Sequence, residues 1–207
     1  RHLKELGWRV KSAHFLMATS DLLHQCLELP PTEARELHDV VKLQVESNLF
    51  LNQDDVWFDY AVQGTDEIST NALVGISNEQ QIQSYREIAN DSGIQVAGLS
   101  SKALSTVVFL RKYHPGIDNE QLLVVSANEV SIDCIAVDCS TIIGVHSREF
   151  TDFSSELSRD EKTVVIQQET ARFFDAMRKR HVDFVPSRVL SLLDDPSSTS
   201  NLTAHFD

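Results

Sequence analysis

The sequence predicts a mixed α/β protein whose two halves differ in their order of elements. In the first half, segments with apolar residues at helical spacing alternate with short strand-like runs, which gives the order βαββαβ. In the second half, three apolar runs with short polar turns precede a long helical segment and a last apolar run, which gives βββαβ. With 207 residues, 42% of them apolar, the chain is long enough to bury a sizeable core.

One stretch in the first half shows both periods side by side. Leu37, Val41 and Val45 lie on one stripe of a helix, whereas Phe58 and Tyr60 follow strand spacing. A polar turn, Asn-Gln-Asp-Asp, separates the two patterns. The other elements expected in this half are strands at 10–17, 22–29, 72–76 and 94–97, and a helix that Ser77 or Asn78 caps and Gly93 ends. The order from residue 21 to residue 97 is that of the ferredoxin-like split βαβ arrangement.

The second half begins with a helix that Ser100 or Ser101 caps, after a predicted break at Gly98. The strands that follow are joined by turns so short that they predict an antiparallel meander, with Gly144 as a hairpin turn. Three strands, a crossover helix and a fourth strand form the ribonuclease-H-like layer found in actin-like folds. The expected bounds are strands at 122–126, 131–138, 141–150 and 184–193, helices at 100–113 and 161–180, and a loose tail from about residue 194. We therefore expect two domains, at residues 1–97 and 98–207.

Composition excludes several classes of function. A net charge of −13 argues against nucleic-acid binding, which needs clustered Lys and Arg. No apolar run reaches the roughly 20 residues of a membrane span. The three cysteines are an odd number without a close Cys-x-x-Cys pair, which favours a reducing, cytoplasmic compartment and no metal site. The first residue is Arg1 rather than Met, so we expect a processed chain or a fragment.

An ordered series of short motifs then resembles the PilM family of type IV pilus assembly proteins, and the cytoplasmic part of the L component of type II secretion is similar. The resemblance covers roughly residues 20 to 150, and Leu49-Phe50 departs from it by lacking the usual Pro between the two residues. The motifs are Leu27-Glu28-Leu29-Pro30, Glu36-Leu37, Glu46-Ser47, Asp54-Asp55-Val56, Phe58-Asp59-Tyr60, the run Ala72 to Ile76, Tyr85, Ser92-Gly93-Ile94 and Ala103-Leu104.

The resemblance implies an actin-like fold with an inserted subdomain at residues 21–97. Residues 98–113 would re-enter the first actin-like half, and residues 120–207 would form part of the second. The family's first strands, with their Asp-x-Gly phosphate loop, would precede Arg1.

Two positions depart from the nucleotide-binding members of the family. Those members carry a second Asp-x-Gly turn, whose carboxylate orders metal and water and whose Gly lets the backbone approach phosphate. Here the turn reads Ser126-Ala127-Asn128. Leu193 and Asp194 stand where a Gly-Gly turn normally lies against adenosine. We therefore expect no ATP, no other cofactor and no catalytic residue.

The leading hypothesis is a non-enzymatic cytoplasmic scaffold beside the inner membrane, which binds the cytoplasmic tail of a membrane pilus or secretion protein. The acidic chain suits a basic tail. One alternative is an actin-like-fold ATPase or phosphotransferase that uses Asp133, Asp138 or Asp152, and another is an interaction module of a different pathway. The residues predicted to bind the partner are Asp54, Asp55, Phe58, Asp59 and Tyr60.

Overall fold

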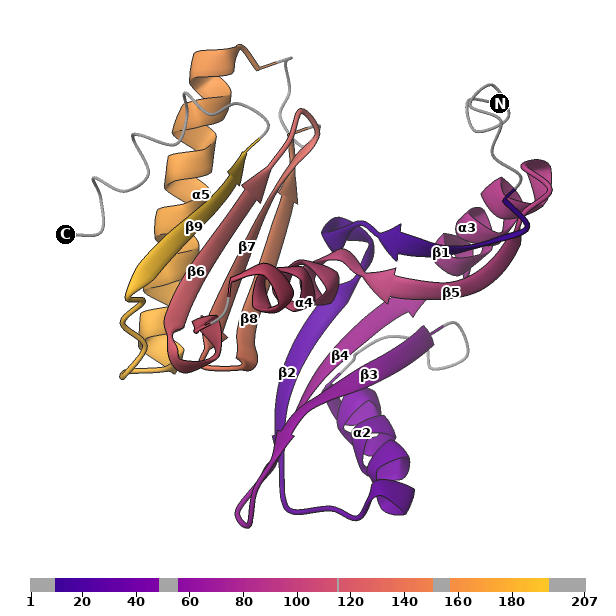
Figure 1. Cartoon of the computed structure of the whole chain (residues 1–207), viewed down its shortest axis with the longest axis horizontal. Helices are drawn as coiled ribbons and strands as arrows, with labels where there is room; N and C mark the ends of the chain where they lie inside the picture. The colour runs from indigo at the N-terminus through magenta and orange to yellow at the C-terminus, as the bar shows by residue number, and fades with distance from the viewer. Residues whose placement is uncertain (1–9, 49–55, 115, 151–156, 194–207) are drawn as a thin grey trace. The chain divides into compact units, whose positions relative to one another are not determined.

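The structure is a computed structural model that describes residues 10–48, 56–114, 116–150 and 157–193 (Figure 1). These residues form two compact units, which are described one at a time. The first unit consists of Arg1–Leu23 and Leu27–Ser105, and the second consists of His24–Cys26 and Thr106–Asp207. The mixture of helices and strands confirms the predicted α/β class.

A three-stranded sheet in the first unit carries one helix on one face. The strands lie in the order β2-β4-β3, and β3 and β4 run antiparallel. The helix α2 lies along this sheet because its apolar stripe packs against side chains of β2 and β4 (Figure 1). The elements are β2 (Leu23–Leu29), α2 (Ala34–Asn48), β3 (Val56–Thr65) and β4 (Thr70–Asn78). The buried cluster between them is Leu29, Leu37, Val41, Val45, Val74 and Ile76.

The helix α3 (Glu79–Asp91) begins and ends where the sequence predicted. Asn78 caps its first turn, since the Asn78 side chain accepts from the Gln81 amide and the Gln81 side chain accepts from the Asn78 amide. Gly93 follows the last turn with φ +67°, a conformation that side chains rarely adopt. Both helix-boundary predictions are confirmed.

The strand after α3 leaves the three-stranded sheet, so the predicted ferredoxin-like arrangement is wrong. β5 (Gln95–Ser101) pairs in parallel with β1 (Ser12–Met17) instead. The predicted break at Gly98 is wrong as well, because β5 continues through it. A Cβ at Gly98 would lie 2.7 Å from Nδ1 of His14, so this glycine makes room for the imidazole of the neighbouring strand.

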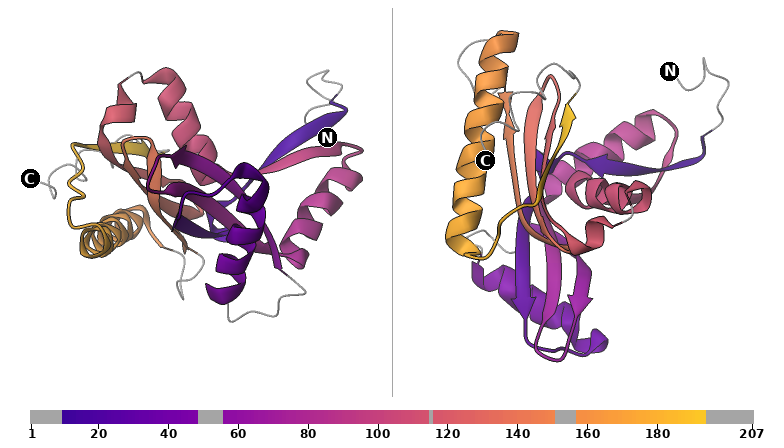
Figure 2. Two further views of the ribbon diagram at one scale, coloured as in Figure 1. Left: turned by 90° about the horizontal axis from the view of Figure 1, so that it is seen from below. Right: turned by 60° about the vertical axis from the view of Figure 1, so that its left-hand side comes forward.

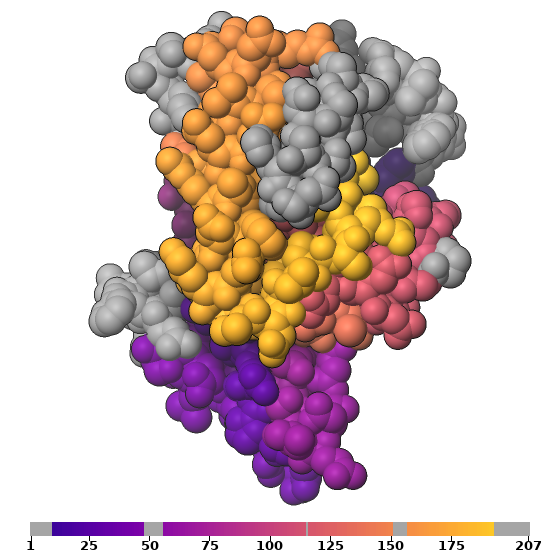
Figure 3. All heavy atoms as spheres, turned by 90° about the vertical axis from the view of Figure 1, so that its left-hand side faces the viewer, coloured from indigo at the N-terminus to yellow at the C-terminus, as the bar shows by residue number. Residues whose placement is uncertain are grey.

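The second unit contains the antiparallel meander that the sequence predicted. Strands β6, β7 and β8 are antiparallel neighbours, and β9 joins β6 in parallel, which gives the order β8-β7-β6-β9. The crossover helix α5 runs along one face of this sheet (Figure 2), and α5 and β9 lie beside each other on the surface in Figure 3. The elements are α4 (Lys102–Tyr113, shared between the units), β6 (Gln121–Ala127), β7 (Ser131–Asp138), β8 (Thr141–Glu149), α5 (Arg159–Arg180) and β9 (Arg188–Leu193).

Gly144 lies in the middle of β8 opposite Ala136, so its prediction as a hairpin turn is wrong. The turn is made instead by Cys139 and Ser140, between β7 and β8. Gly144 has a packing role, because a Cβ there would overlap Sδ of Met177 on α5. The core under α5 consists of Leu123, Val125, Ala127, Ile132, Cys134, Ala136, Phe150, Ile166, Phe173, Met177 and Phe184.

Candidate functional site

The turn between β6 and β7 holds the residues that the sequence comparison with nucleotide-binding members singled out. Ser126 and Ala127 are the last residues of β6, and Asn128 opens the turn. The Asn128 carboxamide oxygen accepts from the amides of Val130 and Ser131, at 2.8 Å each. The side chain of Asn128 therefore engages two of the backbone N–H groups of this turn.

The second predicted departure lies at the end of β9. Leu193 is the last residue of this strand, whereas Asp194 lies outside the described residues. The pairing partner of Leu193 on β6 is Ala127. The structure thus brings the end of β9 beside the β6–β7 turn.

The carboxylates considered for an ATPase do not form one site within the described part of the chain. Asp133 is buried, 3% exposed, and accepts from the Ser147 hydroxyl at 2.6 Å. Asp138 accepts from the side chain of Gln121 at 3.2 Å. Asp152 lies outside the described residues. Among the described residues, no group of three or more His, Cys, Asp and Glu side chains is placed to hold a metal ion.

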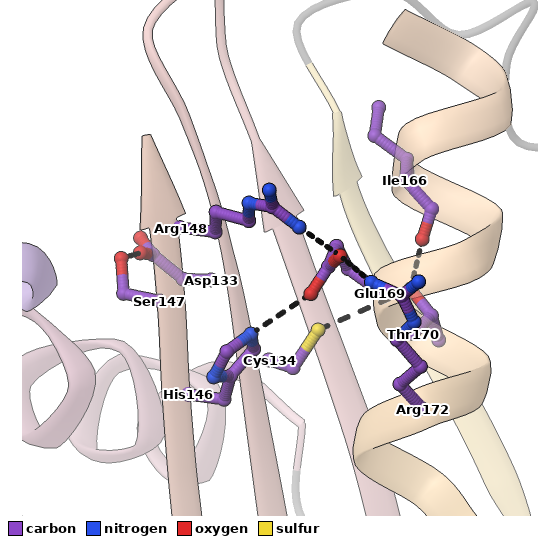
Figure 4. Close-up of polar contacts among 9 residues, drawn as sticks. All are labelled: Asp133, Cys134, His146, Ser147, Arg148, Ile166, Glu169, Thr170 and Arg172. Carbon is purple, nitrogen blue, oxygen red and sulfur yellow. Dashed lines mark hydrogen bonds and ion pairs between the residues drawn. The ribbon is translucent and has the colours of Figure 1, made fainter. Parts of the chain in front are cut away.

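A polar cluster that sequence reasoning missed joins α5 to β8. Glu169 points from α5 toward β8, with its side chain 6% exposed (Figure 4). One carboxylate oxygen accepts from Arg148 and, at 2.8 Å, from Arg172, and the other lies 3.2 Å from Nε2 of His146. Burial opposes the charged form of Glu169, but hydrogen bonds from Arg148 and His146 outweigh it, and the pKa of this carboxyl lies below its ordinary value.

Cys134 lies next to this cluster and is inert as a nucleophile. Burial raises the pKa of the Cys134 thiol to about 12, so the thiolate is not formed near neutral pH. Its sulfur lies 3.9 Å from the hydroxyl of Thr170, which donates to the carbonyl of Ile166. The contacts of this thiol and of Glu169 connect the helix to the sheet.

The aromatic residues of the predicted partner-binding strand face the core of their own unit. Phe58 and Tyr60 are partly buried and pack on the cluster between α2 and β4. His38 of α2 stacks on Phe58, with ring centroids 5.4 Å apart and an interplanar angle of 17°. The side chains of Phe58 and Tyr60 therefore pack β3 against α2. The other two predicted residues, Asp54 and Asp55, lie outside the described residues.

The opposite face of β3 carries an exposed aromatic ring that sequence reasoning missed. Trp57 is 48% exposed, and the guanidinium of Arg86 on α3 lies 5.3 Å from its ring centroid. Asp59 shares this face and accepts from the backbone amide of Tyr60 at 2.8 Å. The signal was present in the sequence, because Trp57 falls at the polar positions of an alternating strand.

The turn from β3 to β4 is acidic. The Asp66 carboxylate accepts from the amides of Ile68 and Ser69, at 2.7 Å each. These two backbone hydrogen bonds lower the pKa of Asp66, so this carboxylate keeps its negative charge at neutral pH and below.

No helix in the described ranges is both long and apolar enough to cross a membrane.

Comparisons with known proteins were made by sequence and by structure. No family model matches the sequence, and no curated protein matches it either. Among solved structures, the PilM-PilN type IV pilus biogenesis complex matches with a TM-score of 0.71 at 13% identity, over 98% of this chain and 68% of that one.

Two further solved structures are similar. The cytoplasmic domain of EpsL, an inner membrane component of the type II secretion system of Vibrio cholerae, has a TM-score of 0.55 at 14% identity over 94% of this chain and 66% of that one. A protein of unknown function with an actin-like ATPase fold from Bacteroides thetaiotaomicron has a TM-score of 0.53 at 11% identity, over 97% of this chain and 68% of that one. The chain therefore has an actin-like fold of the kind seen in PilM and the EpsL cytoplasmic domain, as the sequence motifs predicted, and spans about two thirds of their length.

Proposed function

We propose that the chain is a non-catalytic scaffold of a type IV pilus or type II secretion assembly. It works on the cytoplasmic side of the inner membrane and binds the cytoplasmic tail of a membrane partner. The likeness to a PilM-PilN complex and to the cytoplasmic domain of an inner membrane component supports this setting. The net charge of −13 favours a basic tail, since opposite charges steer and select partners.

The β6–β7 turn carries the non-catalytic part of the proposal. A phosphate is held by free backbone N–H groups, and a catalytic metal needs a carboxylate beside them. Here Asn128 engages the amides of Val130 and Ser131, and Ser126 stands where the resemblance places the metal-binding Asp. The residues present at this turn do not fit a nucleotide with its metal ion.

Titration with a fluorescent ATP analogue tests the non-catalytic part. With Mg²⁺ present, we expect no saturable binding at any analogue concentration up to the millimolar range. An Asn128→Gly variant frees the two amides but adds no carboxylate, so it should not bind either. Saturable binding to the wild-type chain with a dissociation constant near micromolar contradicts the proposal.

Affinity purification from an inner-membrane extract tests the scaffold part. The immobilised chain should retain a membrane-anchored pilus or secretion protein and release it at high salt, because the attraction is electrostatic. A preparation unfolded in urea serves as the control for non-specific retention. If no membrane-anchored component of these assemblies is recovered, the scaffold proposal fails.

A further inference from the structure

The outer edge of β3 is open within the described part of the chain. The sheet order β2-β4-β3 places β3 at the edge, with β4 on one side and no described strand on the other. The Tyr60 amide donates to the side chain of its neighbour Asp59, from which we infer that it points to the outer edge. Alternate residues of a strand present their backbone groups to the same edge. Phe58, Tyr60 and Val62 therefore offer N–H and C=O groups outward.

The sequence from β3 through the turn to β4 carries charged side chains of one sign only, which is negative. Between Lys42 and Arg86 the sequence contains no Lys or Arg. The same interval contains Glu46, Asp54, Asp55, Asp59, Asp66, Glu67 and Glu79. Among the described residues, Asp59 lies on β3 itself, and Asp66 and Glu67 lie in the turn that follows it. These negative charges favour Lys and Arg in an extended segment that approaches β3, and they oppose a second copy of the same acidic strand.

Trp57 supplies an apolar contact beside the open edge. Its ring is half-exposed on the face of β3 opposite Phe58 and Tyr60, and Arg86 lies over the ring. Because the ring already carries the Arg86 cation, its exposed part suits an apolar side chain or the aliphatic stem of a basic one. Exposed Trp is also among the residues that contribute most to binding energy in interfaces.

We propose that β3 accepts an extended, Lys- and Arg-rich segment as an additional strand. The segment forms main-chain hydrogen bonds with Phe58, Tyr60 and Val62, and one of its side chains packs on Trp57. This inference rests on the proposed function, because it says how the partner's tail is bound. It adds the mode of binding, which is strand addition, and the chemistry that the tail must have.

Asp59 gives this edge its selectivity. In the free chain its carboxylate engages the Tyr60 amide, which protects the edge against pairing with unrelated strands. An entering strand takes that amide, and the displaced, exposed carboxylate can then pair with a basic side chain of the segment. An acidic segment would instead place a second negative charge beside Asp59.

Binding of a synthetic peptide tests the proposal. The probe is an acetylated decapeptide in which Lys and Val alternate, titrated by calorimetry. One matched peptide carries N-methyl groups on alternate amides along one edge, and another carries Glu in place of Lys. We expect the N-methylated peptide to bind about tenfold more weakly, because it loses the main-chain hydrogen bonds, and the Glu peptide not to bind. Amide hydrogen exchange of Phe58, Tyr60 and Val62 should slow when the Lys peptide binds.

Two variants test whether the Lys peptide contacts Trp57 of β3. Trp57→Ala should weaken the Lys peptide about tenfold, whereas Val182→Ala removes a side chain that is 82% exposed in the second unit and should leave affinity unchanged. The peptide comparison uses an unaltered β3, so its result does not depend on how well a variant folds.

Equal binding of the N-methylated peptide, or unchanged exchange of the three β3 amides, overturns the proposal. If a membrane partner is recovered but these amides do not respond to it, strand addition is wrong while the proposed function stands. If the amides are protected in the free chain in a concentration-dependent way, a second copy occupies the edge and the proposal is also wrong.

Discussion

Single residues decide how closely α5 approaches the sheet, and Gly144 is the clearest case. A Cβ at this position would overlap Sδ of Met177 and would lie 2.9 Å from Cε of the same residue and 3.3 Å from Cζ of Phe173. Gly144→Ala should therefore lower the free energy of unfolding by about 1–3 kcal/mol, the usual cost of overpacking a core.

Urea unfolding followed by circular dichroism measures this effect. Gly64→Ala is the matched control, because a Cβ at Gly64 meets no atom within 4 Å. We expect the control to change the free energy of unfolding by less than about 0.5 kcal/mol. Equal stability of Gly144→Ala and wild type contradicts the packing role of this glycine.

Other residues show why sequence reasoning stops short of the site. The tight turn at Cys139 and Ser140 was predictable from its length, but the positive φ of +53° at a cysteine was not, since glycine or asparagine favours that conformation. In the sequence, Asn128 was interpreted only as a residue that replaces the glycine of an Asp-x-Gly turn. Its role in closing the turn depends on two hydrogen bonds that appear only in three dimensions.

At the scale of elements, Glu169 ties α5 to β8, and this contact depends on pH. The pKa of Glu169 is lower in the folded chain than its ordinary value, so the unfolded chain takes up the proton more readily. The stabilisation is complete above the ordinary Glu range, near pH ~4.3. It is lost as the pH falls through the lower pKa of the folded state.

Glu169→Gln should lower the free energy of unfolding by about 1–3 kcal/mol at pH 7, because Arg148, Arg172 and His146 lose a charged acceptor. The difference from wild type should shrink below pH ~4, where the wild-type carboxyl is itself protonated. Urea unfolding at several pH values measures this. Asp175→Asn, at an exposed position of the same helix, should change the free energy of unfolding by less than about 0.5 kcal/mol at pH 7. A constant difference for Glu169→Gln across the pH range would rule out the ionic contact.

Strand pairing is the element-scale property that the sequence did not determine. Strand spacing and short apolar runs identified β2, β3, β4 and β5 as strands, and the element order was right. Periodicity marks which face of a strand is apolar, but it does not say which strand lies beside it. β5 was expected in the sheet of β2 and joined β1 instead, by a parallel pairing that brings together residues more than eighty positions apart. Short hairpins avoid this ambiguity, which is why the meander β6-β7-β8 was predicted correctly.

At the scale of the whole molecule, the negative net charge has opposite effects on the stability of the fold and on binding of a basic partner. A net charge of −13 opposes compaction through self-repulsion, and the same charge attracts a basic partner. Salt screens both effects, because the screening length falls from about 30 Å at 0.01 M to about 3 Å at 1 M. The fold class and the net charge were readable from the sequence, but the place of Asp59 on an edge strand needed the structure.

We therefore expect salt to change stability and binding in opposite directions. Raising the NaCl concentration from about 0.01 M to about 1 M should raise the urea midpoint of the chain, because self-repulsion is screened. The same change should weaken binding of the Lys–Val decapeptide by about tenfold or more, because its attraction to the acidic strand is screened. Measuring the urea midpoint and the peptide affinity on one preparation shows that the weaker binding at high salt does not result from unfolding of the chain. Affinity that stays constant across this range means that the tail is held without the carboxylates around β3, and charge then plays no part in choosing the partner.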